Sequence, residues 1–290
     1  MNIKGVCFCS LALGRGYNYL AKQLASDLAR FAPGTRFLVL TDHPAVFKSL
    51  DNVEAVHHRK RSVLGYNDKL CVIREALTRF STVVFIDADT RILAPVTLRS
   101  EIFIPGLRAF IIRRWSFMLD TYDRSAQGPW WQKSDLERMT LLAKEFSLPD
   151  NGRDTPFIVE FLFSITRGDG VDTQSFLQEW GDLAEFSEMR GFFNHLGFSM
   201  GLAAQLTHFP VDEHDFAGIK FFEPLVVSRA VHVKNGSITE EECDVLEATI
   251  RPHKDGNRKS GFQGQPLREV ITKLRHLKIR LFGLNLLSSV

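Results

Sequence analysis

Long apolar runs are absent from this chain. None of its 290 residues lies in a run of eighteen or more apolar residues, the length that a membrane-spanning helix requires. The first residues are also unlike a secretion signal. The chain opens with residues 2–4, Asn-Ile-Lys, and reaches the polar Arg15 before any long apolar core develops. We therefore expect no spanning helix and a cytoplasmic protein.

Cysteine is scarce, with four in the chain. Cys7 and Cys9 share one short apolar stretch, whereas Cys71 and Cys243 stand alone, so the spacings indicate no disulfide framework. A single residue separates Cys7 from Cys9, where zinc and redox pairs have two. We expect reduced, mostly buried thiols and no metal at Cys7 and Cys9.

Two glycine motifs for nucleotide binding are also missing. Gly14-Arg15-Gly16 opens the dinucleotide fingerprint, but Tyr19 occupies the place of its third glycine. No Gly-Lys-Ser/Thr of a phosphate-binding loop follows. These absences disfavour a Rossmann oxidoreductase and a P-loop enzyme.

What the chain contains is ordinary globular material. Its 44% hydrophobic and 24% charged residues are enough for a substantial core and argue against disorder. The net charge of +2 is unevenly distributed. Residues 251–290 hold nine basic side chains against Asp255 and Glu269, so this tail is basic and the remainder is mildly acidic.

Apolar runs alternate with helical periodicity along the first ninety residues. The predicted elements are strands at residues 3–11, 37–40, 53–56 and 82–86 and helices at residues 20–31 and 66–80. Continuously apolar strands separated by helices indicate a parallel sheet covered on both faces, with ligands at the carboxyl ends of the strands. We therefore predict an α/β fold with a Rossmann-like, mainly parallel sheet flanked by helices.

The pattern weakens after Pro95. Further elements are predicted as strands at residues 109–112, 158–165 and 225–233 and a helix at residues 198–206. Residues 235–264 are polar and contain glycine, which indicates a flexible connection. We therefore divide the chain into a domain of residues 1–240 and a basic extension of residues 241–290.

The extension ends in a predicted amphipathic helix. Its apolar stripe consists of Leu267, Val270, Ile271, Leu274, Leu277 and Leu281. Because the opposite face is basic, two interpretations stay open: the helix docks on the body of the protein, or it lies on the anionic inner face of a membrane. No recognised nucleic-acid-binding module accompanies the basic residues, so nucleic acid is not an expected partner.

The strongest chemical signal is Asp87-Ala88-Asp89, which follows the apolar residues 83–86. In an extended chain alternate side chains share a face, so we expect Asp87 and Asp89 to lie roughly 7 Å apart on one side of the strand end. Two such carboxylates suit a hard divalent cation, Mn²⁺ or Mg²⁺, which keeps positions open for phosphate oxygens. The alternative interpretation is a solvated strand end with two acidic residues.

Over residues 68–93 the chain resembles the sugar-nucleotide transferases of the GT-A fold, and in particular the glycogenin-like retaining family. The matches are Lys69-Leu70 at the opening of a helix, residues 85–89 at the end of a strand, and Ile92-Leu93 after it. The resemblance implies a fold of the GT-A type and a nucleotide-sugar donor.

The resemblance also implies roles for single residues. Lys69 is expected to approach the donor phosphates or sugar, where a lysine acts as a fixed point charge; the alternative is a solvated helix residue. Asp87 and Asp89 are expected to hold the metal and the ribose, and Ala88 is expected to contact the donor. Asp89 is also a candidate catalytic residue. The first strand and turn, Ser10-Leu11-Ala12, corresponds to the segment that cradles the nucleotide base.

Later matches to the family are looser. There a late histidine, followed by a glycine and a lysine, completes the metal shell and grips the diphosphate, and the counterparts here are His232 and Lys234. A neutral imidazole is an adequate third ligand for Mn²⁺. Lys234, however, precedes Gly236 and no Lys-Pro-Trp follows, so a buried strand histidine stays an alternative for His232.

Two further positions follow from the resemblance. Glu160 is the only acid within residues 156–164, where the family places the strand that lines the donor sugar. Such a lone carboxylate is either exposed at an edge or held for sugar hydroxyls or the reacting carbon, which makes Glu160 a candidate catalytic residue. Asn194-His195 matches the acceptor-side acidic pair of the family in position, although the residue types differ.

We therefore expect a metal-dependent hexosyltransferase that moves a sugar from a nucleoside diphosphate donor, UDP-linked, to a carbohydrate or lipid-linked acceptor. Two alternatives stay open. A phosphatase of the haloacid dehalogenase type also has Asp-x-Asp after an apolar strand, but Arg91 stands where its threonine would be. A non-catalytic carbohydrate-binding protein would stack Trp115, Trp130 and Trp131 on sugars.

Overall fold

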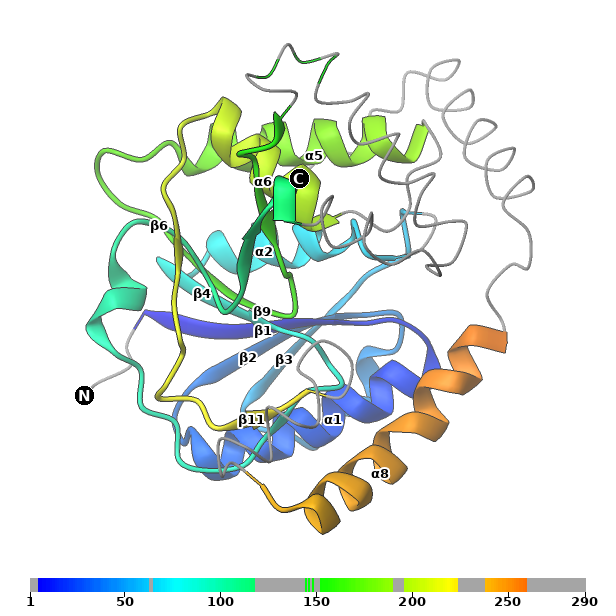
Figure 1. The fold of residues 1–290 in the computed structure, drawn as a ribbon. Helices are drawn as coiled ribbons and strands as arrows, with labels where there is room; N and C mark the ends of the chain where they lie inside the picture. Colours follow the sequence, from blue (N-terminus) through cyan, green and yellow to red (C-terminus); the bar gives the residue numbers. More distant parts are fainter. Residues whose placement is uncertain are drawn as a thin grey trace.

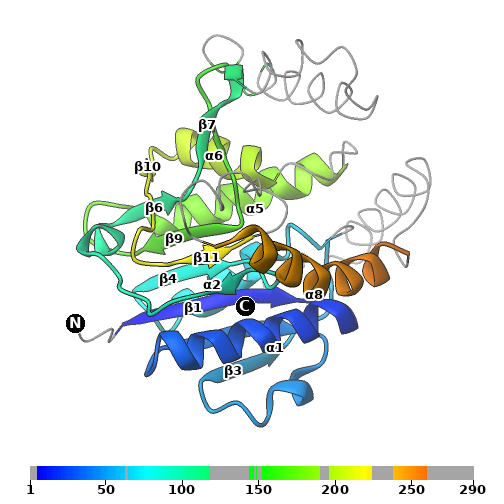
Figure 2. The same cartoon turned by 60° about the horizontal axis from the view of Figure 1, so that its bottom comes forward.

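The structure is a computed structural model of the 290-residue chain, shown as a ribbon in two views (Figures 1 and 2). It describes residues 5–62, 65–117, 152–189, 196–223 and 238–259, together with residues 144, 146 and 148, and of residues 196 and 255–259 the backbone alone. Among these described residues, no helix has the length and apolarity to cross a membrane.

A seven-stranded sheet forms the centre of the molecule. Its strands are β1 (Val6–Ala12), β2 (Arg36–Thr41), β3 (Val53–His57), β4 (Thr82–Ile86), β6 (Gly106–Ala109), β9 (Leu162–Thr166) and β10 (Val211–Glu213). They lie in the order β10-β6-β9-β4-β1-β2-β3. β9 runs antiparallel to its neighbours β4 and β6, and the other pairs in the sheet are parallel.

Helices cover both faces of the sheet (Figures 1 and 2). On one face lie α1 (Gly14–Phe31) and α8 (Glu240–Lys259), and on the other α2 (Lys69–Leu77), α5 (Thr173–Met189) and α6 (Leu196–Leu206). Because side chains alternate along a strand, Cys7 and Phe85 enter the core under α2 and α5, whereas Phe8 and Val84 enter the core under α1. The predicted α/β fold, with a Rossmann-like, mainly parallel sheet between helices, is confirmed.

Several short elements lie outside this sheet. They are the strand pairs β5 (Arg91–Ile92) with β11 (Phe221–Phe222) and β7 (Ile112–Arg114) with β8 (Pro156–Ile158), and the 3-10 helices η1 (Pro44–Phe47) and η2 (Ser100–Phe103). The continuous strands predicted at residues 109–112 and 158–165 are therefore wrong. Each is divided because β6 and β9 belong to the central sheet and β7 and β8 to a separate pair, so the chain leaves the sheet between them.

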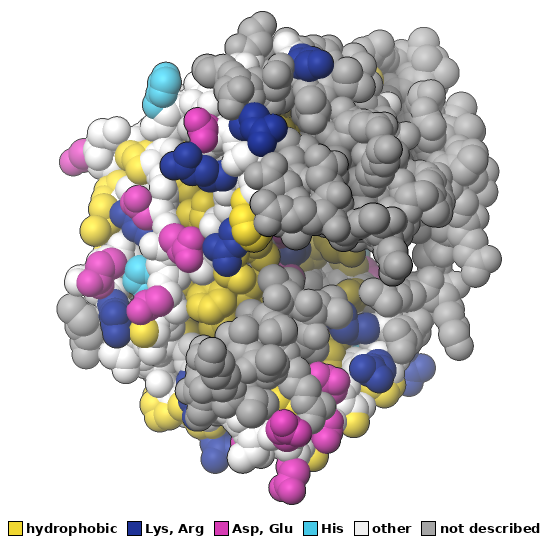
Figure 3. Space-filling view, viewed as in Figure 1, with side chains coloured by type: hydrophobic (Ala, Val, Ile, Leu, Met, Phe, Trp, Pro, Cys, Tyr) yellow, Lys and Arg dark blue, Asp and Glu magenta, His cyan; other side chains and the backbone are white. Residues whose placement is uncertain are grey.

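Helix α8 begins within the segment that the sequence indicated as a flexible connection. Thr239 and Glu242 form a reciprocal capping box at its start: the N–H of Glu242 donates to Thr239 Oγ1 at 3.2 Å, and the N–H of Thr239 donates to Glu242 Oε2 at 2.7 Å. Acidic side chains gather over this helix start, at the lower edge of the face in Figure 3, where the helix dipole favours them. The expected connection is wrong over residues 240–259, and the division of the chain at residue 240 stays a prediction.

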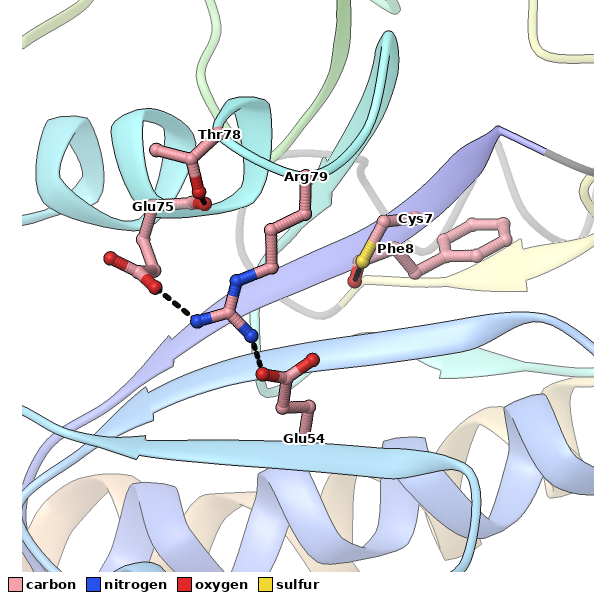
Figure 4. A network of polar contacts seen from close by, with 6 residues as sticks. All are labelled: Cys7, Phe8, Glu54, Glu75, Thr78 and Arg79. Atoms are coloured by element: carbon pink, nitrogen blue, oxygen red, sulfur yellow. Dashed lines mark hydrogen bonds and ion pairs between the residues drawn. The ribbon is translucent and has the colours of Figure 1, made fainter.

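Helix α2 is anchored at both ends to β3 and the segment after it. Beyond its last turn, Arg79 pairs with Glu75 at 2.5 Å and with Glu54 of β3 (Figure 4). Before its first turn, the carboxylate of Asp68 accepts two backbone N–H groups from the segment that follows β3, both at 2.8 Å. These contacts fix the helix whose first residue is Lys69.

Candidate functional site

The candidate site lies at the carboxyl end of β4, in the middle of the sheet. The N–H of Asp87 donates to the carbonyl of Phe161 at 2.9 Å, which continues the β4–β9 ladder by one residue. The chain then turns, because the N–H of Thr90 donates to the carbonyl of Asp87 at 3.0 Å. The expected extended arrangement of Asp87 and Asp89 is therefore wrong, since a turn ends the alternation of faces on which their spacing depended.

Lys69 lies against the first of the two carboxylates. Its Nζ is 2.8 Å from Asp87 Oδ1 and donates to the backbone carbonyl of Glu160 at 3.1 Å. The side chain is 7% exposed and also covers the ring of Phe85, 5.1 Å from its centroid. The start of α2 and the end of β4 thus bring Lys69 and Asp87 together.

The second carboxylate is paired with a residue that the sequence did not single out. Lys254 of α8 forms an ion pair with Asp89, and the two side chains are 13% and 6% exposed. The capping box before α8 is a local signal for this helix. No local signal predicts that its Lys254 reaches the end of β4.

Close packing of α8 on α1 brings Lys254 to the site. The rings of His253 and Tyr19 stack with their centroids 4.0 Å apart. At Gly16 a Cβ would lie 2.2 Å from the carbonyl oxygen of His253, so only glycine allows this approach. Gly16, which resembled part of a phosphate-binding motif, therefore serves helix packing.

Burial and crowded charges change the acidity of the site. Burial, with the nearby carboxylates of Asp89 and Glu160, raises the pKa of Asp87 to about 7, although the ammonium group of Lys69 opposes the shift. Burial lowers the pKa of Lys69, but the negative charges of Asp87, Glu160 and Asp89 outweigh it, so this pKa lies above its ordinary value. Lys69 therefore stays a cation, whereas Asp87 titrates near neutral pH.

Glu160 lies in the turn between β8 and β9, whereas the sequence predicted a strand there. Its carboxylate lies at the start of α6, because a Cβ on Gly197 would be 3.3 Å from Glu160 Oε2. The positive end of a helix dipole stabilises a carboxylate in such a position. With its backbone carbonyl on Lys69, Glu160 belongs to the same cluster as Asp87.

Ser10, Leu11 and Ala12 form the carboxyl end of β1, between the ends of β4 and β2. Next to them, the N–H of Gly14 donates to both carboxylate oxygens of Asp42, at 3.1 and 3.0 Å. Asp42 therefore fills the place at the start of α1 that a phosphate takes in dinucleotide-binding and P-loop proteins. This arrangement agrees with the absence of both glycine motifs.

The residues at the end of β4 fit a divalent cation. Asp87 and Asp89 supply carboxylate oxygens, which Mn²⁺ and Mg²⁺ prefer as ligands. The Oγ1 of Thr90 and the Oγ of Ser10 are buried without a hydrogen-bond partner among the described residues, so polar atoms near both strand ends lack the partner that a ligand would supply. Because Lys254 already neutralises Asp89, a cation has to compete with that lysine.

Several expected site residues lie outside the described parts of the chain. They are His232, Lys234, Asn194 and His195, with the tryptophans Trp130 and Trp131. Their roles as metal ligand, diphosphate contact, acceptor contacts and sugar-stacking rings stay predictions. The third tryptophan, Trp115, is 1% exposed and packs in the core, its ring 5.1 Å from that of Phe198, so it offers no face to a sugar.

The sequence was compared with protein-family models and with curated proteins. No family model matches it, and no curated protein is similar to it at a significant level.

Proposed function

We propose that this protein is a metal-dependent glycosyltransferase of the GT-A type, which moves a hexose from a nucleoside diphosphate donor, UDP-linked, to a carbohydrate or lipid-linked acceptor. The proposal depends on one observation: Lys69 is buried against Asp87 at the end of β4, with Asp89 and Glu160 beside them. This end of an open α/β sheet is where such folds bind their ligands.

Charges of both signs suit a diphosphate and its cation. Asp87 and Asp89 would hold Mn²⁺ or Mg²⁺, with His232 as the predicted third ligand, and the bound ion would neutralise charge on the departing diphosphate. Lys69 keeps its positive charge at neutral pH, so it attracts phosphate oxygens of the donor whether or not Asp87 is protonated. Lys69 and the ion held by Asp87 would therefore bind the donor at its phosphates.

Glu160 and the end of β1 would hold the two ends of the donor. The carboxylate of Glu160 can accept hydrogen bonds from sugar hydroxyls and stabilise positive charge that develops at the reacting carbon. The carboxylate lies at the start of α6, so the position of that helix fixes where the carboxylate faces the sugar. The base would lie over Ser10-Leu11-Ala12 at the neighbouring strand end.

Asp89→Asn tests the metal site, because it removes one negative charge and keeps the shape of the side chain. We expect the Mn²⁺-dependent affinity for UDP to fall by at least about tenfold, since even an altered outer partner of a metal ligand costs about 10–100-fold. Titration calorimetry with UDP at a fixed Mn²⁺ concentration measures it. Asp154→Asn is the matched control, because that exposed carboxylate pairs with Arg114 on the surface. Unchanged affinity in the Asp89 variant would reject the site.

Slow hydrolysis of a UDP-hexose separates an enzyme from a carbohydrate-binding protein. We expect release of UDP that requires Mn²⁺ or Mg²⁺ and is absent in Asp89→Asn. Binding of the sugar nucleotide with no metal-dependent release of UDP would favour the non-catalytic alternative.

A further inference from the structure

A second group of metal-binding side chains lies between the end of β3 and the start of α2. His58 directly follows β3, Asp68 precedes α2, and Cys71 lies in the first turn of that helix. One ligand atom from each side chain lies within 4.8 Å of the other two. Asp68 and Cys71 are thus close to Lys69 in sequence, but they form a cluster separate from Asp87 and Asp89.

The spacing of these atoms suits one tetrahedral ion. The distance from His58 Nε2 to Asp68 Oδ2 is 3.3 Å. A Zn²⁺ ion holds nitrogen and oxygen ligands at about 2.0–2.2 Å, so two such ligands of a tetrahedral ion lie about 3.3 Å apart. A zinc ion holds a sulfur ligand at about 2.3 Å, and the sulfur of Cys71 lies within 4.8 Å of the ligand atoms of His58 and Asp68.

The polar groups of this cluster are arranged as a metal site requires. His58 is 6% exposed, and its Nε2 makes no hydrogen bond with any described residue. The hydroxyl of Ser62 is also buried without a described partner. The Asp68 carboxylate, by contrast, is held in place by the N–H groups of Arg61 and Ser62, each at 2.8 Å, as an outer shell holds a metal ligand. An oriented carboxylate therefore lies 3.3 Å from an imidazole nitrogen that makes no hydrogen bond with the described residues.

We propose that His58, Asp68 and Cys71 bind a Zn²⁺ ion that joins the segment after β3 to the first turn of α2. Imidazole nitrogen, carboxylate oxygen and thiolate sulfur are all zinc ligands, and the soft sulfur selects against Mg²⁺ and Mn²⁺. One carboxylate and one thiolate also cancel the charge of the ion, so no net charge is buried. A water molecule takes the fourth position of the tetrahedral ion.

Zinc binding displaces one proton. Burial and the neighbouring Asp68 raise the pKa of the Cys71 thiol to about 11, so the thiol is protonated when the site is empty. Formation of the sulfur–zinc bond releases that proton to solvent, which is the usual linkage between metal binding and thiol ionisation. The ion then fixes the start of the helix on which Lys69 lies.

Cobalt is the probe for this site, because a Co²⁺–thiolate bond gives a charge-transfer absorption band in the near ultraviolet. The full-length chain is freed of metal with a chelator and titrated with Co²⁺. We expect one ion per chain with that band, and its loss when Zn²⁺ displaces Co²⁺. No band at one equivalent of Co²⁺ in the wild-type chain would overturn the proposal without recourse to any variant.

Variants then assign the ligands. Cys71→Ser should remove the band, and His58→Gln should weaken Co²⁺ binding by at least about tenfold. Cys243→Ala is the matched control, because this buried thiol belongs to α8 and should leave the band unchanged. A band that persists in Cys71→Ser would overturn the proposal.

The two metal sites are distinguishable. Asp89→Asn should keep the Co²⁺ band, and Cys71→Ser, where circular dichroism shows it folded, should keep Mn²⁺-dependent UDP binding. Loss of the band in Asp89→Asn would show that the ion binds at the end of β4, and this result would overturn the zinc proposal. Loss of UDP binding in Asp89→Asn with the band retained is the result that both proposals expect.

Discussion

A single residue separates Asp87 from Asp89, yet their charges are balanced by helices on opposite faces of the sheet. Lys69 of α2 is held both by Asp87 and by the Glu160 carbonyl, and it is the first residue of an anchored helix. Lys254 extends from α8, which is the outer helix against α1. A cation that enters the site therefore displaces Lys254 more easily than Lys69.

Lys254→Ala should strengthen Mn²⁺ binding, because it removes the positive charge that competes for Asp89. We expect a gain of roughly fivefold or more, since even an exposed ion pair is worth up to ~1 kcal/mol. Electron paramagnetic resonance of free Mn²⁺ measures the affinity. Arg251→Ala is the matched control on the same helix, because its side chain is 73% exposed and pairs with Glu247. Weaker Mn²⁺ binding in Lys254→Ala would show that the lysine supports the ion.

The pKa of Asp87 predicts a pH dependence for the metal site. Because this pKa is raised to about 7, a proton occupies the carboxylate below that pH and competes with the cation. Mn²⁺ affinity should therefore rise from pH 6 towards pH 8, with a slope of about tenfold per unit well below the pKa. Binding isotherms at several pH values measure it.

A histidine is the usual alternative source of such a pH profile. His253 lies next to Lys254 on α8, so His253→Gln is the control variant and should keep the profile. A flat profile in the wild-type chain would contradict the role assigned to Asp87.

Glycine allows α6 to lie directly on β8. A Cβ at Gly201 would be 1.7 Å from the carbonyl oxygen of Pro156, and a Cβ at Gly197 would be 1.9 Å from that of Ile158. The two glycines are four residues apart, so they share one face of the helix. This close approach also sets the distance between the start of α6 and Glu160.

Gly201→Ala should destabilise the fold although alanine is the better helix former. The atom in the way belongs to the backbone, so α6 itself has to shift, and we expect the free energy of unfolding to fall by about 1–3 kcal/mol. Urea denaturation measures it. Gly181→Ala on α5 is the matched control, because its new Cβ would meet the side-chain ends of Arg74 and Leu70 at 3.1 Å. Equal losses in both variants would contradict the packing argument.

Most central elements could be predicted from local pattern alone. The apolar run that became β4 and the periodic stripe that became α2 were both visible, because a strand buried on two faces is continuously apolar and a helix is not. The sequence predicts one strand in place of β8 and β9, since no local feature shows that they pair with different strands. The sequence does not predict α8, although Thr239-x-x-Glu242 is a capping box, because the polar, glycine-containing residues of this segment indicate a loop.

At the scale of the whole molecule, the part of the basic tail that follows residue 259 lies outside the described residues. The predicted helix over residues 267–281 has an apolar and a basic face. We predict weak attachment to anionic vesicles that salt abolishes, because exposed charges are screened over about 10 Å at 0.1 M salt. Sedimentation with such vesicles at low and high salt tests it. A chain truncated after Gly264 is the control, and equal sedimentation of this truncated chain would refute the attachment.

The sequence by itself determined the α/β alternation and put two acidic residues at the end of a buried strand, since both follow from local hydrophobic pattern. It also indicated Lys69 beside them, through a resemblance that spans only residues 68–93. These are short-range properties. Each can be inferred before the chain is folded.

Only the tertiary structure decided which charges meet. Lys254 pairs with Asp89, from which it is 165 positions distant in the chain. Asp42, which follows β2, accepts a hydrogen bond from Gly14 at the start of α1. His58 likewise meets Cys71 only because β3 and α2 are held together. Contacts of this kind depend on how helices pack on a sheet, and packing is set by the complementary shapes of distant segments, which no local pattern encodes.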